Sequence, residues 1–188
     1  ESVVQNNPDA VVLIDEAYVD FGGDSCIPLI EKYPNLLVVQ TLSKSRSLAG
    51  LRVGAAIGNT DLIEGLKRIK NSFNAYPLDS LAMAGAAAAF DDQETFTHNR
   101  KRIIETREWT GEALTKLGFY VVPSRANFLM VRHKEVPAQE LYSQLKDQGI
   151  LVRYFNRPRI DGFLRVTIGT MEEMQDFIRT LQAITNKS

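Results

Sequence analysis

Two short runs of apolar residues do most to constrain the fold of this chain. Val11–Ile14 and Leu36–Val39 contain no polar residue and are rich in β-branched side chains. Such runs are typical of strands buried on both faces, as in a parallel sheet that is covered by helices. Ile27–Tyr33 is predicted to form a short helix between them, which completes a strand–helix–strand unit. The chain is therefore expected to belong to the α/β class.

A third strand is predicted over Val53–Ile57, and the short connection before it indicates its direction. Eight residues lie between Lys44 and Val53, whereas a crossover to a parallel strand takes about a dozen residues or more. The third strand should therefore run antiparallel to the second. Its start, with Arg52 just before it, should lie at the edge of the sheet where the first two strands end.

The remainder of the chain is predicted to combine helices with a second group of strands. Thr60 is expected to cap the first of these helices, and Thr170 with Glu173 forms a capping-box pattern for the last. Further helices are expected over Leu81–Phe90, Thr95–Leu117 and Pro137–Gly149, and strands over Phe119–Val122, Asn127–Arg132, Ile150–Arg153 and Phe163–Ile168. Residues 1–75 should belong to a sheet-centred domain, 76–105 to connecting helices and 106–188 to a smaller α+β domain.

Charge and cysteine content exclude several classes of function. The 188 residues include 22 Lys and Arg against 23 Asp and Glu, a formal net charge of -1. Proteins that bind nucleic acid or anionic membranes need an excess of basic residues. The single cysteine, Cys26, excludes an internal disulfide and a zinc site built on several cysteines. The chain is predicted to be cytoplasmic, with no membrane span and no metal.

Polar side chains are predicted to gather at one edge of the first sheet. Ligands of open α/β sheets bind outside the carboxyl ends of the strands. One carboxylate, one phenol, two hydroxyls, one amine and one guanidinium should meet there, from Asp15, Tyr18, Thr41, Ser43, Lys44 and Arg52. Pyridoxal phosphate suits this set, since it carries a ring nitrogen, a ring hydroxyl, an aldehyde and a phosphate. Alone, Asp15 would be read as a turn residue and Lys44 as a solvated one.

Three motifs occur here in a fixed order. Asp-Glu-Ala-Tyr begins at Asp15, Thr-Leu-Ser-Lys ends at Lys44, and Ala-Gly-Leu-Arg-Val-Gly begins at Ala49. The set resembles the core of the class I and II pyridoxal-phosphate aminotransferases of fold type I, the group that contains histidinol-phosphate aminotransferase. The similarity extends to Leu164–Gly169 and covers nearly the whole chain.

The resemblance implies a role for each candidate residue. Asp15 pairs with the pyridine nitrogen, Tyr18 with the ring hydroxyl, and Lys44 is the catalytic lysine that forms the Schiff base. The cofactor phosphate is held by Thr41, Ser43 and Arg52. In the substrate site, Arg165 binds the amino acid's carboxylate, Arg153 binds the substrate phosphate, and Asn127 lines the pocket.

The resemblance also implies a function. It is transamination of histidinol phosphate with 2-oxoglutarate, in histidine biosynthesis, by a homodimer acting on small molecules. Family members are longer, so the chain is expected to be the C-terminal half. An aromatic-amino-acid aminotransferase, a phosphothreonine decarboxylase and an inactive fragment remain alternatives. So does a structural role for Arg153 and Arg165, as ion-pair partners of Asp161 or Glu135.

Arg46 departs from the family pattern, which has small or aromatic residues after the lysine. Its guanidinium could lower the pKa of the nearby Lys44 amine, but exposure to solvent is the preferred interpretation.

Overall fold

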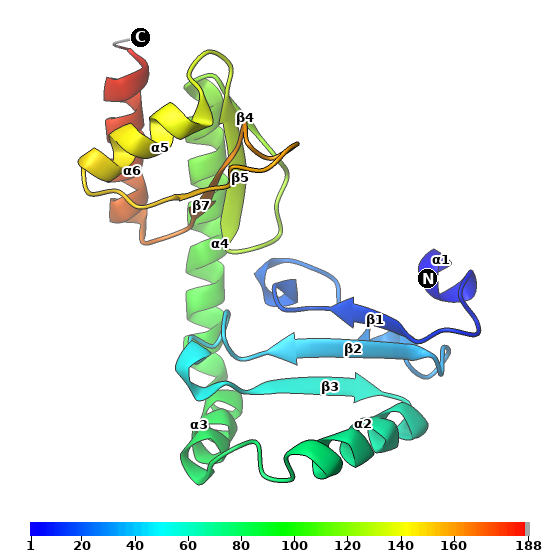
Figure 1. Cartoon of the computed structure of the whole chain (residues 1–188). Coiled ribbons are helices and arrows are strands. Elements are labelled where there is room, and N and C mark those ends of the chain that lie inside the picture. Colours follow the sequence, from blue (N-terminus) through cyan, green and yellow to red (C-terminus); the bar gives the residue numbers. More distant parts are fainter. Residues whose placement is uncertain (187–188) are drawn as a thin grey trace. The chain divides into compact units, whose positions relative to one another are not determined.

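The computed structural model describes residues 1–186 and divides into two compact units, Glu1–His98 and a second that begins at Asn99. Each unit contains its own sheet with helices packed on it (Figure 1). The predicted α/β class is confirmed. The domain limits at residues 75 and 105 stay a prediction.

The first unit is built on a mixed three-stranded sheet in the order β1-β2-β3. Its strands are β1 (Val12–Asp15), β2 (Leu36–Thr41) and β3 (Gly54–Gly58). β1 runs parallel to β2, and β3 runs antiparallel to it. The direction predicted for the third strand from its short connection is therefore confirmed.

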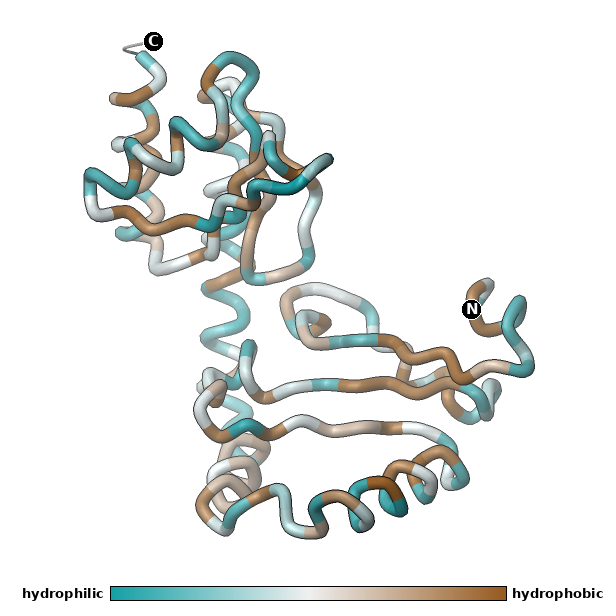
Figure 2. Tube along the Cα trace, in the orientation of Figure 1, coloured by the Kyte–Doolittle hydropathy of each residue, from teal (hydrophilic) through white to brown (hydrophobic). Residues whose placement is uncertain are grey.

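Only one face of β1 is covered. Leu36 and Val38 are buried, and the partly buried Val12 and Ile14 pack with them under side chains from the β1–β2 connection. On the other face of β1, Leu13 is 54% exposed. The prediction that this strand is buried on both faces is wrong, because within residues 1–98 the β1–β2 connection covers only one face of it. Figure 2 shows the hydrophobic stretches of β1 and β2.

The β1–β2 connection is less helical than predicted. The connection contains two 3₁₀ turns, η1 (Val19–Phe21) and η2 (Ile27–Leu29), and η2 is all that forms of the helix expected over Ile27–Tyr33. Pro34 ends the segment, since the residue before a proline is disfavoured in helical conformation.

Helices α2 (Thr60–Phe73) and α3 (Ser80–Asp91) follow the first sheet. Asn59, and not Thr60, is the N-cap of α2, because its side chain accepts the Asp61 amide. The close packing predicted for α3 is confirmed at Gly85, where a Cβ atom would lie 2.7 Å from Leu51. This helix packs beside η3 (Ala49–Leu51), the short turn that leads to β3.

The second unit contains an antiparallel sheet in the order β4-β5-β7-β6. The strands are β4 (Phe119–Val121), β5 (Phe128–His133), β6 (Arg153–Tyr154) and β7 (Leu164–Thr167). The predicted strand Ile150–Arg153 is paired only at its end. Gly118 follows the long helix α4 (Gln93–Lys116) with a φ of 84°, a conformation that glycine adopts without strain.

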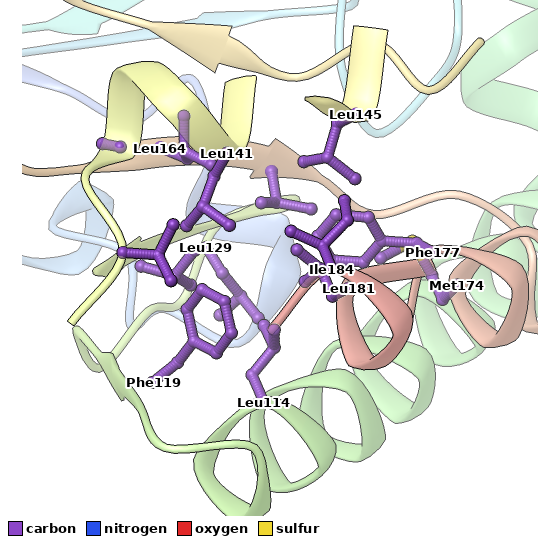
Figure 3. Close-up of a cluster of buried hydrophobic side chains, with 14 of the residues drawn as sticks. Leu114, Phe119, Leu129, Leu141, Leu145, Leu164, Met174, Phe177, Leu181 and Ile184 are labelled. Atoms are coloured by element: carbon purple, nitrogen blue, oxygen red, sulfur yellow. The ribbon is translucent and has the colours of Figure 1, made fainter. Parts of the chain in front are cut away.

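Alternate residues of this sheet form the main core with α4, α5 (Ala138–Asp147) and α6 (Met171–Thr185). Figure 3 shows the core leucines, among them Leu114, Leu129 and Leu181, with Phe119 and Phe177. Both bonds of the predicted capping box at Thr170 and Glu173 are present. None of the helices within residues 1–186 is both long and apolar enough to cross a bilayer. The side chains on the opposite face of this sheet do not belong to the main core.

Candidate active site

The ends of β1 and β2 and the start of β3 meet at one edge of the first sheet. Asp15 pairs with Val39, and Thr41 pairs with Gly54. Because neighbouring side chains alternate between faces, Asp15 and Thr41 project from the same face. Gly54 on β3 adds no side chain to that face. The edge therefore presents a carboxylate and a hydroxyl beside an open stretch of backbone.

The loop after β2 brings the next candidates together. Thr41 donates its hydroxyl to Ser43 Oγ at 2.9 Å and accepts the Ser43 amide at 3.1 Å. The Lys44 Nζ atom lies 5.6 Å from the centre of the Tyr18 ring. Residues predicted from two separate motifs thus lie side by side.

The charged residues of this edge are exposed and are not paired with one another. Asp15 accepts the Ala17 amide at 2.9 Å, and Arg52 donates to the Ala49 carbonyl at 2.9 Å. Arg52 has a φ of 56°, which the turn before β3 imposes on it. Within residues 1–186, no ion pair joins Asp15, Lys44 or Arg52 to any side chain. Their charges remain available to a ligand.

Glu16 is a residue of this edge to which no role was assigned from the sequence. Its buried carboxylate accepts Ser25 Oγ, the Cys26 amide and Gln40 Nε2. It ties the end of β1 to the crossover and to β2, directly beside Asp15. The sequence pattern of two adjacent acids after a strand indicated a role for the exposed Asp15 but none for the buried Glu16.

Arg46 does not face solvent, contrary to the preferred interpretation. Its guanidinium lies between the rings of Phe90 and Phe96, 4.6 and 4.0 Å from their centres, and donates to the Ala89 carbonyl. Ser45, next to it, is buried and donates to Asp20 at 2.5 Å. Ser45 and Arg46, which follow Lys44, are thus held by contacts with Asp20 and with the rings of Phe90 and Phe96.

Two arginines of the second unit lie opposite each other in neighbouring strands. Arg153 of β6 pairs directly with Arg165 of β7, on the sheet face away from the main core. Phe155 lies 5.5 Å from the Arg153 guanidinium and 5.8 Å from that of Arg165. Phe128 is 5.4 Å from Arg165. The two cations are therefore grouped around aromatic rings.

Neither arginine has an acidic partner within residues 1–186. No ion pair forms with Asp161 or Glu135, which removes that alternative. The Nε atom of Arg165 is buried and has no acceptor there. A buried donor without an acceptor is costly unless a ligand supplies one. A carboxylate or phosphate fits this requirement, since it can accept two parallel hydrogen bonds from a guanidinium.

Asn127 precedes β5, and its backbone oxygen accepts the Ile168 amide at 2.9 Å. Its side-chain amide makes no hydrogen bond within residues 1–186. The structure places it next to Phe128, whose ring contacts Arg165. The three substrate candidates thus lie within one sheet and its adjoining loop.

The family is evident from comparison with known proteins. The profile of "Aminotransferase class I and II" matches residues 2–181. The chain therefore belongs to the class I and II aminotransferases.

Several members of this class are similar to the chain over nearly its whole length. The chain is 57% identical over 184 residues to a histidinol-phosphate aminotransferase of Aromatoleum aromaticum, covering 98% of the chain and 52% of the relative. It is 56% identical to histidinol-phosphate aminotransferase 1 of Hydrogenovibrio crunogenus, with the same coverage. A crystal structure of a putative histidinol-phosphate aminotransferase from Erwinia carotovora matches with a TM-score of 0.88 and 27% identity, over 100% of the chain and 54% of that structure. The chain thus spans about half the length of the relatives it matches.

Proposed function

We propose that the protein catalyses pyridoxal-phosphate-dependent transamination between histidinol phosphate and 2-oxoglutarate. Because the chain spans about half the length of its relatives, the activity is proposed for the full-length protein, called here the full-length enzyme. The names of the similar proteins support this choice. We further propose that it acts in the cytoplasm as a homodimer.

The observation that carries the choice of substrate is the pairing of Arg153 with Arg165. Like charges directly opposite each other in a sheet are unfavourable, and neither has an acidic partner within residues 1–186. A reaction with one phosphorylated and one carboxylated amino donor gives each guanidinium an anion in turn. Arg153 is assigned to the phosphate of histidinol phosphate and Arg165 to the α-carboxylate of glutamate.

The edge of the first sheet fits the cofactor. When bound, pyridoxal phosphate supplies a ring that accepts electrons from the substrate's α carbon. With the cofactor bound, the Asp15 carboxylate would keep the ring nitrogen protonated, and the Tyr18 hydroxyl would bind the ring oxygen. Lys44 would hold the aldehyde in the resting enzyme, and its Nζ, once released by the substrate, would move the proton of the amine-bearing carbon. The linked hydroxyls of Thr41 and Ser43, together with Arg52, would bind the phosphate.

The direct test is turnover by the purified full-length enzyme with cofactor and 2-oxoglutarate. We expect glutamate to form from 2-oxoglutarate with histidinol phosphate as the amino donor. The specificity constant for histidinol phosphate should be at least about tenfold above that for histidinol, since a hydrogen bond to a charged group is worth about 1.5–3 kcal/mol. Preference for phenylalanine would indicate an aromatic aminotransferase. Release of carbon dioxide from phosphothreonine would indicate the decarboxylase. Either result would contradict the proposal.

Lys44→Ala should abolish this turnover and leave the fold intact. Lys44 is exposed, and its ammonium contacts the ring of Tyr18, so its loss removes little packing. Circular dichroism and thermal unfolding check the fold, and Lys67→Ala on the exposed side of α2 is the matched control. A Lys44→Ala enzyme that keeps more than a trace of turnover would show that the lysine is misassigned.

A further inference from the structure

A buried arginine of α4 contacts the loop that carries Asn127. Arg107 is 5% exposed, and its Nη1 donates to the Ala126 carbonyl at 3.0 Å. Its Nε and Nη2 atoms donate to Glu108 Oε1 at 3.1 and 2.8 Å. Glu108 itself is 65% exposed. The guanidinium is therefore oriented by a surface carboxylate and donates to the backbone oxygen of Ala126.

Burial of a guanidinium is unfavourable unless its hydrogen bonds are made, so this contact is a specific feature of the fold. Lysine could not replace it, because an ammonium lacks the planar fork that binds Glu108 and Ala126 together. The arrangement requires an arginine at this position of the helix.

The same loop is fixed at successive residues. Ser124 Oγ donates to the Phe128 carbonyl at 2.7 Å and accepts the Ala126 amide at 3.1 Å. The Asn127 carbonyl accepts the Ile168 amide at 2.9 Å. Arg107 adds the contact to Ala126, which ties the loop to α4. The backbone on both sides of the Asn127 side chain is thus held.

The contact between Arg107 and Ala126 also bears indirectly on the pair formed by Arg153 and Arg165. Phe128 is the first residue of β5, and its ring lies 5.4 Å from the Arg165 guanidinium. A shift of the loop at Ala126 would move both Asn127 and the ring against which Arg165 rests. One helix residue can therefore affect two substrate candidates.

We infer, on the basis of the function proposed above, that Arg107 is a positioning residue for substrate recognition. It holds the loop so that Asn127 and Phe128 keep the geometry needed to bind both amino donors. Its effect passes chiefly through Asn127, the neighbour of the Ala126 carbonyl that Arg107 binds.

The test uses Arg107→Met and Arg107→Lys in the full-length enzyme. Loss of a hydrogen bond from a charged donor changes an equilibrium by roughly ten- to a hundredfold. We expect KM for histidinol phosphate and for glutamate to rise about tenfold or more, with kcat changed less than about threefold. Glu112→Gln is the matched control, because it removes an exposed carboxylate charge from the same helix at a residue outside the contact between Arg107 and Ala126. It should change KM less than about twofold.

A double-mutant cycle separates positioning from general destabilisation. If Arg107 acts through Asn127, the substitution should cost far less in an Asn127→Ala background, since coupled residues give non-additive effects. Additive losses would overturn the inference. Arg107→Lys serves the same cycle if Arg107→Met does not fold.

Hydrogen exchange gives a readout that does not depend on activity. Amides of residues 124–128 should exchange faster in Arg107→Met than in the wild type, while those of α5 should be unchanged. Unchanged exchange in residues 124–128 would also overturn the inference. If the wild-type enzyme does not use histidinol phosphate but Arg107→Met still speeds exchange in residues 124–128, the proposed function is refuted and the hold on the loop is established.

Discussion

Arg153 and Arg165 are direct cross-strand neighbours, and no carboxylate within residues 1–186 pairs with either of them. Two guanidinium groups in this position repel each other when no anion is bound. Phe155 offsets part of this repulsion, since its ring lies within 6 Å of both cations. The arrangement is typical of a binding site, where stability is given up for recognition.

Arg153→Gln should therefore stabilise the protein without ligand. We expect a gain of about 0.2–1 kcal/mol in the free energy of unfolding, which shrinks as salt screens the charges. Urea unfolding at low and high ionic strength measures it. Arg132→Gln, on the same face of the sheet, contacts the rings of Tyr120 and Phe163 and is the matched control, with no gain expected. Destabilisation by Arg153→Gln would contradict the interpretation of the pair.

The sequence predicted the residues of the sheet edge better than the residues that support them. Asp15, Thr41 and Arg52 could be placed because a strand's direction decides the edge at which its ends lie. Glu16 and Arg107 were missed, because their partners lie far along the chain or are backbone atoms. A buried charge has no sequence pattern of its own.

Helix α4 begins at a carboxylate that responds to pH. Asp92 accepts the Thr95 amide at 3.0 Å. This hydrogen bond and one from the Thr95 side chain hold the pKa of Asp92 below its usual value of 3.8, and the nearby Arg46 charge adds to the effect. The stabilisation is thus present above the unfolded pKa and is lost as the pH falls through the lower, folded pKa.

Asp92→Asn should consequently remove a pH-dependent part of stability. Asparagine is also a good N-cap, so the variant keeps the hydrogen bond and loses the charge. The difference in melting temperature from the wild type should be small but present at about pH 6 and should be lost as the pH falls through the lowered pKa of Asp92. Glu94→Gln in the first turn of α4 is the control for charge alone. A difference that grows on acidification would contradict this account.

At the scale of elements, hydrophobic pattern predicted which segments form strands but not which faces are covered. The sequence of β1 predicts a fully buried strand, yet Leu13 is 54% exposed. Burial depends on what packs over the strand, which the pattern of one segment does not contain. The strand expected over Ile150–Arg153 is paired only at its end, where β7 provides a neighbour. Pairing partners are a property of the assembled sheet.

The first unit exposes a large apolar surface on and after α2. Ile69, Phe73, Tyr76 and Leu81 are 68%, 93%, 91% and 78% exposed. Monomeric proteins rarely leave large apolar surfaces in water. This group is expected to be covered in the full-length enzyme.

The chain on its own should therefore self-associate or bind a hydrophobic dye. Phe73→Ser combined with Leu81→Ser should lower both dye fluorescence and light scattering by about half or more. Leu151→Ser in the second unit is the control, because Leu151 is 80% exposed but stands apart from this group in the sequence. Equal effects of the two changes would argue against a localised patch.

Single-turnover kinetics of the two half-reactions test most directly whether one arginine serves each substrate. The full-length enzyme and its Arg153→Ala, Arg165→Ala and Arg132→Ala variants are mixed separately with histidinol phosphate and with glutamate. Arg153→Ala should lower the specificity constant for histidinol phosphate by about 10- to 100-fold, or about 1.5–3 kcal/mol, and that for glutamate by less than about threefold. Arg165→Ala should chiefly slow the glutamate half-reaction, and Arg132→Ala neither. Equal losses for phosphorylated and non-phosphorylated donors in Arg153→Ala would contradict the assignment of histidinol phosphate.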